Sequence, residues 1–393
     1  MKKGWTYKKL GEVFKTYAGG TPSKANKANY INGTIPWLRS GEVCKKYITE
    51  SELYISEEGL RNSSAKYYPI NTVLIAMYGA TAAQCGILKF EATSNQAVCG
   101  VLPQKDFLPE FVYSYFVYIK DALAAQAQGG AQPNISQEKI KNVYFPCIPL
   151  SEQKLIVSRL DAAFSHIDEL KANAEKQLSE ARALFQKSLA KALEPKEDWK
   201  FYHLQDICTD VVDCPHTTPR KVDKPTIYPC IRTSELRGGQ IDWKTMQYLD
   251  EEEYKKRTTR IIPKENDIVY GREGTYGDAA LLPKGYCFSL GQRTMLLRPN
   301  VDLVYPEFLL NMLISTHVYE QAKAKNSGCG VGHVNVKDIK VFKIYIPPLS
   351  EQQRIVERLD ALSAHVRELE ENQKKIISEC DALKQALLRK VFE

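Results

Sequence analysis

The stretch S-E-Q-K-L-I-V-S-R-L-D at residues 151–161 recurs as S-E-Q-Q-R-I-V-E-R-L-D at residues 350–360. From these starts, residues 151–194 align with residues 350–393 without a gap, and 22 of the 44 positions are identical. Ordinary residue frequencies would supply roughly three identities by chance. The chain of 393 residues is therefore one design of nearly 200 residues used twice.

Each copy of the repeat is expected to form one long helix. Ser151 and Ser350 can cap the first amide groups, and a glutamate follows each of them in the first turn. No Pro or Gly interrupts either copy. At 1.5 Å per residue, some 40 residues make a rod of about 60 Å.

Apolar residues follow a heptad-like spacing in both copies, which calls for a partner helix. One expected seam carries Ile156, Leu160, Ala163, Ile167, Leu170, Ala174, Ala181 and Leu184, and the other carries Ile355, Leu359, Leu362, Val366, Leu369, Ile376, Leu383 and Leu387. If these seams pair, connectivity makes the helices antiparallel and relates the two halves by a pseudo-two-fold axis. The alternative is that each helix packs on its own head or on another subunit.

The regions before the two helices are weakly similar in sequence, for example in Pro-Glu-Phe at 109–111 and at 306–308. Short β-rich runs lie between Gly, Asn and Pro, and helices are expected at 109–126 and 306–325. We expect an α+β fold in which two mixed α/β domains, 1–150 and 195–349, are joined by the helices 151–194 and 350–393. The helices would form a coiled coil that holds the two heads apart.

The motifs of several enzyme classes are missing from the sequence. There is no P-loop, no amino-methyltransferase tetrapeptide, and no His or Cys spacing typical of a metal site. We therefore expect a binding protein without a catalytic residue, cofactor or metal of its own. The ten cysteines form no CxxC pair, and no apolar run is long enough for a signal peptide or membrane span, which predicts a reduced, cytoplasmic protein.

The net charge of +7 is unevenly distributed. Residues 1–150 carry +6 and residues 195–349 carry +2, whereas the two repeats carry 0 and −1. Basic heads with polar loops suit duplex DNA, because Lys and Arg release counterions and polar tips can read base edges.

The candidate DNA-contacting residues are those in loops that the two heads share in position but not in composition. They are Thr21, Ser23, Lys24, Arg39, Ser40, Tyr78, Thr81, Asn95 and Gln96 in the first head, and Arg220, Lys221, Arg232, Thr233, Arg272, Glu273, Thr275, Tyr276, Gln292 and Arg293 in the second. The alternative for Arg39 and Arg232 is that each pairs only with a local carboxylate.

The sequence resembles the specificity (S) subunit of type I restriction-modification enzymes over essentially its whole length. The resemblance rests on I-P-L-S-E-Q at 148–153 and P-L-S-E-Q at 348–352, each followed by I-V-x-R-L-D, and on G-T-P-S at 20–23 and I-P-W-L at 35–38. The second head departs from the last two motifs, with H-T-T-P at 216–219 and C-I at 230–231.

The resemblance implies that each head is a target-recognition domain for one half of a bipartite, asymmetric DNA target, with the helices setting the unread spacer. It further implies two modification subunits that bind S-adenosylmethionine and methylate adenine, docked in part on the helices. Two motor-nuclease subunits that hydrolyse ATP with Mg²⁺ would complete the complex. The rival hypothesis is a coiled-coil adaptor whose heads bind peptide or RNA; a self-sufficient methyltransferase is disfavoured by the missing cofactor motif.

Overall fold

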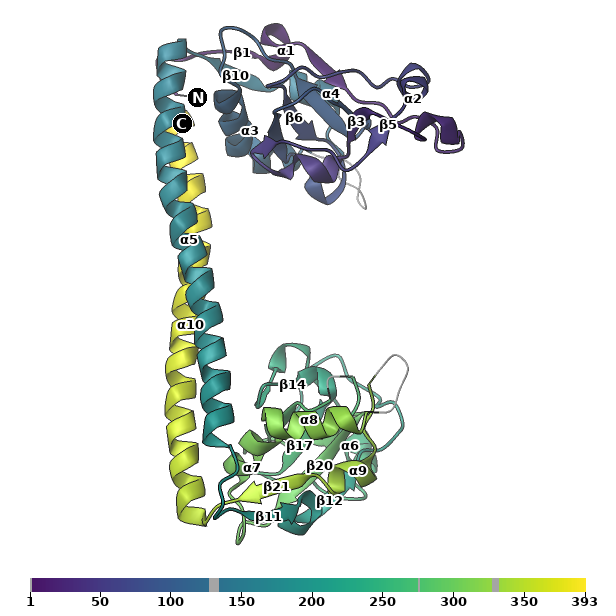
Figure 1. Ribbon diagram of the computed structural model, residues 1–393, viewed down its shortest axis with the longest axis vertical. Coiled ribbons are helices and arrows are strands. Elements are labelled where there is room, and N and C mark those ends of the chain that lie inside the picture. The colour runs from purple at the N-terminus through teal and green to yellow at the C-terminus, as the bar shows by residue number, and fades with distance from the viewer. Residues whose placement is uncertain (1, 127–133, 275, 327–331) are drawn as a thin grey trace. The chain divides into compact units, whose positions relative to one another are not determined.

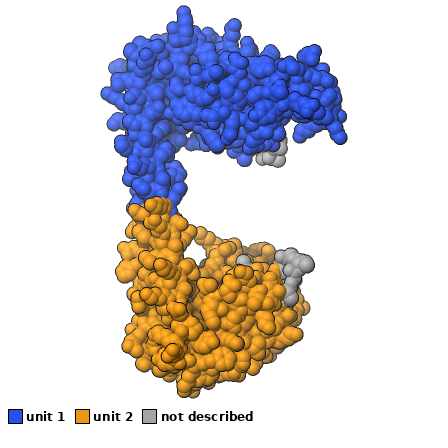
Figure 2. Space-filling model, in the orientation of Figure 1, with its two compact units in different colours: residues 1–175, 374–393 blue, residues 176–373 orange. Residues whose placement is uncertain are grey.

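The computed structural model describes residues 2–126, 134–274, 276–326 and 332–393. Two compact units divide the chain, and Figure 2 shows them in different colours. Unit 1 contains residues 1–175 and 374–393, and unit 2 contains residues 176–373. Each unit thus combines one globular head with the first part of one long helix and the last part of the other. The four-part domain division from the sequence stays a prediction.

The two long helices are α5 (Leu150–Ala192) and α10 (Leu349–Phe392), which Figure 1 shows side by side. In unit 1, Lys171 Nζ lies 2.8 Å from Asp381 Oδ1, and Lys384 pairs with Asp168. Residue numbers therefore fall along α10 as they rise along α5, so the helices are antiparallel. The predicted pairing of two long helices is confirmed.

The two helices are antiparallel in unit 2 as well, where Arg182 Nε lies 2.7 Å from Glu370 Oε1. Gln373 Nε2 also donates to Gln177 Oε1 at 2.9 Å. Two polar contacts thus cross the pair in each unit.

The predicted seam is only partly buried. Leu160, Ile167 and Leu359 are buried, and Ile156, Ile355 and Val366 are partly buried. Five predicted seam residues are instead exposed by 36–58%, namely Leu170, Leu184, Leu369, Ile376 and Leu383. The buried positions near them belong to Ala174, Ala181, Gln373 and Cys380. A two-helix pair buries only one narrow stripe, and in this stretch Ala, Cys and Gln side chains occupy it while these five residues stay exposed.

The head of unit 1 contains short strands and a few helices. Its strands are β1 (Thr6–Lys9), β2 (Thr16–Ala18), β3 (Ile35–Leu38), β4 (Tyr47–Ile48), β5 (Tyr54–Ile55), β6 (Val73–Ala76), β7 (Cys85–Leu88), β8 (Thr93–Ser94), β9 (Val98–Val101) and β10 (Tyr144–Cys147). Its helical segments are α1 (Leu10–Val13), η1 (Lys27–Asn29), η2 (Ser40–Cys44), α2 (Glu57–Arg61), η3 (Gly79–Thr81), α3 (Pro109–Ala124) and α4 (Gln137–Lys141), where η marks a 3-10 turn.

Three sheets organise this head. A five-stranded mixed sheet has the order β2-β9-β6-β7-β4, a three-stranded sheet has the order β5-β3-β8, and β1 pairs with β10 in antiparallel fashion. The apolar residues of α3 face the five-stranded sheet, where Phe111 and Phe116 are fully buried. Phe392, at the end of α10, packs against Phe111 and Tyr115 in the same core.

The head of unit 2 repeats this plan. Its strands are β11 (Lys200–His203), β12 (Cys208–Asp213), β13 (Pro229–Ile231), β14 (Leu236–Arg237), β15 (Gln240–Ile241), β16 (Gln247–Tyr248), β17 (Ile268–Gly271), β18 (Ala279–Leu281), β19 (Ser289–Leu290), β20 (Thr294–Pro299) and β21 (Lys343–Ile346). Its helical segments are η4 (Leu204–Ile207), η5 (Thr233–Glu235), η6 (Trp243–Thr245), α6 (Glu251–Arg257), α7 (Pro306–Leu313), α8 (Thr316–Ala324) and α9 (Val336–Lys340).

The described residues of unit 2 form four sheets, of which three correspond to those of unit 1 and β14-β15 is additional. They have the orders β12-β20-β17-β18, β16-β13-β19, β14-β15 and β11-β21. In both heads a central strand pairs in parallel with a later one, β3 with β8 and β13 with β19. The α+β prediction is confirmed. The single helix expected at 306–325 is instead α7 and α8, because Ser315 interrupts it and caps α8.

Candidate nucleic-acid interface

Three of the predicted reading loops of unit 1 meet at one end of its sheets. Thr21 Oγ1 hydrogen-bonds Gln96 Oε1, which joins the loop after β2 to the loop after β8. Asn95 N donates to Leu38 O at 2.9 Å, which brings Asn95 beside the chain segment that continues into Arg39. The parallel pairing of β3 with β8 causes this meeting, since parallel strands end at the same edge of a sheet.

The fourth predicted loop of unit 1 adjoins the others. Met77 N donates to Ala97 O at 2.8 Å, so Tyr78 starts next to the loop that carries Gln96. Thr81 ends η3, which contacts η2, the turn that begins at Ser40. The remaining predicted residues are Ser23 and Lys24, which lie exposed in the loop that begins at Thr21.

A hollow of about 610 Å³ is lined by the segment 39–52 and by Asn95. Arg39, Ser40 and Asn95 line it together with residues that the sequence reasoning had not singled out, including Glu42, Cys44, Tyr47 and Glu52. Tyr47 is 40% exposed and lies under the ammonium groups of Lys46 and Lys89, 5.3 and 4.7 Å from its ring centroid. The hollow thus offers a guanidinium, an amide and carboxylates, the groups that distinguish base edges.

Arg39 contacts two carboxylates, that of Glu52 at the surface and that of Glu42, whose side chain is only 12% exposed. Its backbone N donates to Glu42 Oε2 at 2.7 Å, and its NH2 lies 2.6 Å from Glu52 Oε2. The Arg39 and Glu52 side chains are 49% and 68% exposed. An exposed pair of this kind is weak, so Arg39 can exchange Glu52 for another acceptor at small cost.

Arg232, the counterpart of Arg39 in unit 2, is held far more tightly. Its NH2 and Nε lie 2.5 and 3.1 Å from the two carboxylate oxygens of Glu235, whose side chain is fully buried. Arg232 NH2 also donates to Thr245 O at 3.1 Å. Thr233 begins η5 directly after this arginine. The guanidinium of Arg232 therefore compensates a buried charge.

A second cluster of unit 2 is centred on Glu273. Its Oε1 lies 3.0 Å from both Arg272 NH1 and His333 Nδ1, and its Oε2 lies 3.3 Å from Arg293 Nε. Arg272 Nε also contacts Asp213 Oδ1 at 3.0 Å, and the Arg272 side chain is only 6% exposed. Arg293 has a φ of +71° and a 55% exposed side chain. Of these arginines, Arg293 is the one that can reach a ligand.

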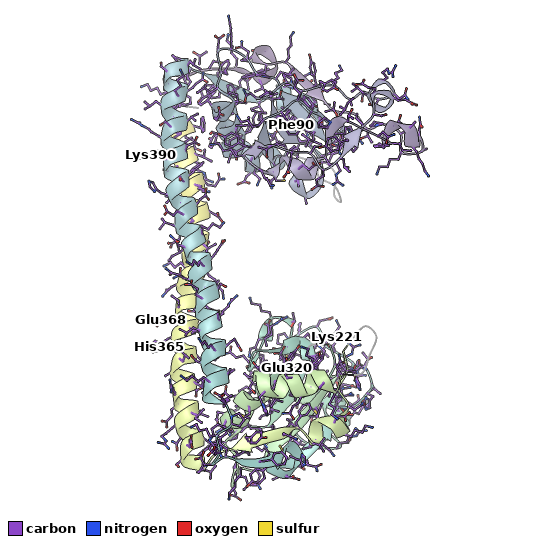
Figure 3. All side chains as sticks on the ribbon, viewed as in Figure 1. Phe90, Lys221, Glu320, His365, Glu368 and Lys390 are labelled. Atoms are coloured by element: carbon purple, nitrogen blue, oxygen red, sulfur yellow. The ribbon has the colours of Figure 1, made fainter. Side chains whose placement is uncertain are left out.

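The other predicted residues of unit 2 are more dispersed. Gln292 Nε2 donates to His216 O at 2.9 Å, next to the Glu273 cluster. Arg220 pairs with Asp250 at 2.8 Å near the start of α6, and Lys221 follows it on the surface (Figure 3). Tyr276 stacks on Tyr319 of α8, with ring centroids 5.8 Å apart. Thr275 lies outside the described residues.

Sequence reasoning missed Arg257, the residue that organises one of these loops. Its side chain is 2% exposed, and it donates to Leu290 O, Thr217 O and Pro215 O at 2.8–3.4 Å. The run E-E-E-Y-K-K-R at 251–257 looks like a solvated helix face, so no local signal could have identified it. Arg257 thereby fixes the loop that leads to Arg220.

The comparisons with known proteins decide the family. The model of the Type I restriction modification DNA specificity domain matches residues 2–180 and again residues 196–379. The chain belongs to the type I restriction-modification specificity subunits. It is the DNA specificity subunit of such a system, and specificity subunits are non-catalytic.

Curated relatives carry the same description. The chain is 23% identical to the EcoKI specificity subunit of Escherichia coli K12, over 100% of this chain and 89% of that relative. It is 33% identical to the EcoR124I/EcoR124II specificity subunit of Escherichia coli, in an alignment that spans 39% of this chain and 40% of that relative.

Two solved structures share the fold of this specificity subunit. A chain from a study of complex assembly and conformational transition of the type I R-M system matches with a TM-score of 0.78 at 19% identity, covering 100% of this chain and 98% of that one. The HsdS subunit of Thermoanaerobacter tengcongensis matches with a TM-score of 0.57, also at 19% identity, covering 100% and 97%.

Two further observations concern what the described residues lack. No described helix has the length and apolar character needed to cross a bilayer. Within the described ranges, no group of three or more His, Cys, Asp or Glu side chains could hold a metal ion. His166 and His365, the matched histidines of the repeats, are exposed on α5 and α10 (His365 is labelled in Figure 3).

Proposed function

We propose that each head of this specificity subunit reads one half of a bipartite DNA target. One observation carries the proposal: the two heads share the strand pairing that positions their loops, but the loops carry different side chains. β3 and β13 each pair in parallel with a later strand, and each is followed directly by an arginine whose backbone N–H donates to a glutamate three residues on. Equivalent scaffolds with different chemistry suit an asymmetric target with two unlike half-sites.

Within each half-site, the exposed polar groups would make the specific contacts. In unit 1 these groups are Arg39, Asn95 and Gln96, whose side-chain chemistry suits guanine and adenine edges in the major groove. In unit 2 they are Arg293 and Gln292. Arg232, 30% exposed and paired with the buried Glu235, and the buried Arg272 instead support the loops.

The helix pair would set the unread spacer between the half-sites. α5 and α10 run without a Pro or Gly over 43 and 44 residues, and polar contacts cross the pair in both units. A continuous helix pair is stiff, so its length converts into a separation along the duplex.

The same helices would dock the modification subunits through the exposed leucines. In unit 1, Leu170 and Leu383 lie at one level of the pair, because Lys171 and Lys384, their neighbours in sequence, pair across it with Asp381 and Asp168. Leu369 is the repeat equivalent of Leu170, and it lies in unit 2 next to Glu370, which pairs with Arg182.

The fourth exposed leucine gives unit 2 the same two leucine positions as unit 1. Leu184, the repeat equivalent of Leu383, lies two residues beyond Arg182. Each unit therefore presents an equivalent apolar pair, as two copies of one partner would require. In the proposal those two partners bind S-adenosylmethionine and methylate adenine, and two motor-nuclease subunits that use ATP and Mg²⁺ complete the complex.

Mapping of methylated adenines tests the proposal directly. The chain is expressed with its modification subunit in a host without adenine methylation, and the genome is sequenced with a method that detects N6-methyladenine. We expect one motif of two unlike half-sites separated by a fixed number of unread base pairs. Methylation at a single continuous motif, or binding of the heads to RNA or peptide in place of duplex DNA, would contradict it.

A further inference from the structure

The third residue of the repeated S-E-Q motif is completely buried in both units. Gln153 and Gln352 are each 0% exposed, in the first turns of α5 and α10. A buried carboxamide costs free energy unless its donors and acceptors are satisfied. An apolar side chain would fill the same space without that requirement, so the amide has a task other than packing.

In unit 1 the amide of Gln153 joins three segments of the chain. Its Nε2 donates to Asp106 O and to Ile148 O, both at 2.9 Å, and its Oε1 accepts from Leu108 N at 2.9 Å. Leu108 is the N-cap of α3, the main helix of the head. One planar group therefore links the start of the long helix to the start of the head's helix and to the end of the strand segment that precedes α5.

Unit 2 contains the same three bonds. Gln352 Nε2 donates to Leu303 O at 3.0 Å and to Pro347 O at 2.9 Å, and its Oε1 accepts from Tyr305 N at 2.9 Å. Tyr305 is the N-cap of α7, the counterpart of α3. The heads themselves have diverged. The junction between each head and its long helix, called the joint below, nevertheless has the same hydrogen-bond donors and acceptors at equivalent positions.

Other contacts at the two joints differ between the units. Glu152 accepts a hydrogen bond from Trp5 Nε1 at 3.0 Å, whereas its equivalent Glu351 pairs with Lys196 at 2.6 Å. Apolar contacts are non-directional and tolerate sliding, whereas hydrogen bonds demand alignment. Three bonds to one planar amide therefore constrain the direction of each long helix relative to its own head.

We propose that Gln153 and Gln352 are positioning residues that restrict the subunit to one spacer length. This inference rests on the proposed function. Moving a half-site by one base pair shifts it by about 3.4 Å and turns it by about 35° around the duplex. A joint held at one angle rejects that displacement, and a joint that can swivel accepts part of it.

The test uses Gln153→Met, Gln352→Met and the double variant, because Met preserves the length of the side chain and removes all three bonds. The full-length chain is purified with its modification subunits. Methylation rates are measured on duplexes whose half-sites, taken from the wild-type methylation map, are separated by the native spacer, by one base pair fewer and by one more. Gln353→Met alters the exposed neighbouring glutamine and serves as the matched control.

We expect the ratio of off-spacer to native-spacer methylation rates to rise about tenfold in each single variant. A change of this size is what the loss of the hydrogen bonds at one of the two glutamines would produce. The double variant should exceed both single variants, and Gln353→Met should match the wild type. Gln352→Asn retains the amide but withdraws it by one methylene, and should relax the ratio in the same direction to a smaller degree.

A second control separates positioning from stability. Leu282→Val thins an apolar cluster of unit 2 that contains no residue of α5 or α10, and it should lower the melting temperature without changing the spacer ratio. If the Gln variants lower the melting temperature but leave the ratio at the wild-type value, the residues are merely structural and the inference is wrong. If the wild type itself shows no fixed spacer, the proposed function fails instead.

Discussion

The guanidinium of Arg232 forms a two-pronged pair with the carboxylate of Glu235, which no solvent reaches. Its counterpart Arg39 pairs with Glu52 at the surface. Two arginines at equivalent positions of two related heads therefore have different tasks: one compensates a buried charge, and the other is available to a ligand.

Arg232→Ala should destabilise unit 2. Removal of one partner leaves the carboxylate of Glu235 buried without its counter-charge, which costs about 3–5 kcal/mol. Urea unfolding followed by tryptophan fluorescence measures the loss, and the double variant Arg232→Ala/Glu235→Gln should recover part of it. Equal stability of Arg232→Ala and wild type would show that the pair contributes nothing.

Arg39→Ala should leave stability within about 1 kcal/mol of the wild type, because its ion pair is exposed. It should weaken discrimination in one half-site only, by about 1–3 kcal/mol at the base pair that Arg39 reads. Competition binding with duplexes substituted one base pair at a time measures this. A uniform loss across both half-sites would instead indicate a phosphate contact or a folding defect.

Shortening both long helices by one heptad should shorten the spacer. Removal of seven residues centred on Gln177 and on Gln373, which hydrogen-bond each other, shortens the pair by about 10 Å, or about three base pairs. The methylation map should then report a shorter spacer with unchanged half-sites. An unchanged spacer would refute the idea that the helices act as a ruler.

Replacement of the exposed leucines by glutamate should prevent the modification subunit from binding. Leu170→Glu/Leu383→Glu should abolish docking at one unit and leave a complex with one modification subunit, since each buried leucine contributes about 1.5–3 kcal/mol. Native mass spectrometry measures the stoichiometry. Leu184→Glu/Leu369→Glu should remove the other copy, and full assembly of all variants would contradict docking on this face.

Cys44 should be the most reactive of the nine described cysteines, because it is exposed beside the hollow of unit 1. Burial raises the pKa of Cys85, Cys99 and Cys208 to about 12, so at pH 8 almost none of these thiols is the reactive thiolate. Iodoacetamide labelling with peptide mass spectrometry measures the order. Cognate duplex should protect Cys44, and labelling unaffected by DNA would place the interface elsewhere.

Much of the fold could be predicted because its signals are local or repeated. The two long helices follow from runs without Pro or Gly, although α5 and α10 begin at Leu150 and Leu349, one residue before the serines that were expected to cap them. The break between α7 and α8 was missed, because Ser315 is a weak helix breaker by composition and acts here through its cap on Val318 N.

The candidate site was less accessible to sequence reasoning. Arg39 and Arg232 both contact the glutamate three residues on, Glu42 and Glu235, as the local-carboxylate alternative expects. Arg39 also pairs with Glu52, 13 residues away, which the sequence did not indicate. The task of Arg257 depends on three carbonyl groups that lie 33 to 42 residues away along the chain. Such partners are assembled only by tertiary folding.

The sequence by itself determined the doubling, the two long helices and the family, because repetition and heptad spacing are written along the chain. Tertiary structure alone decided which leucines are buried, which arginines are available and what the repeated glutamine does. Those outcomes depend on burial and on hydrogen-bond geometry between distant segments. Gln153 and Gln352 were visible from the start as part of a motif, and only the three bonds around each of them reveal a joint.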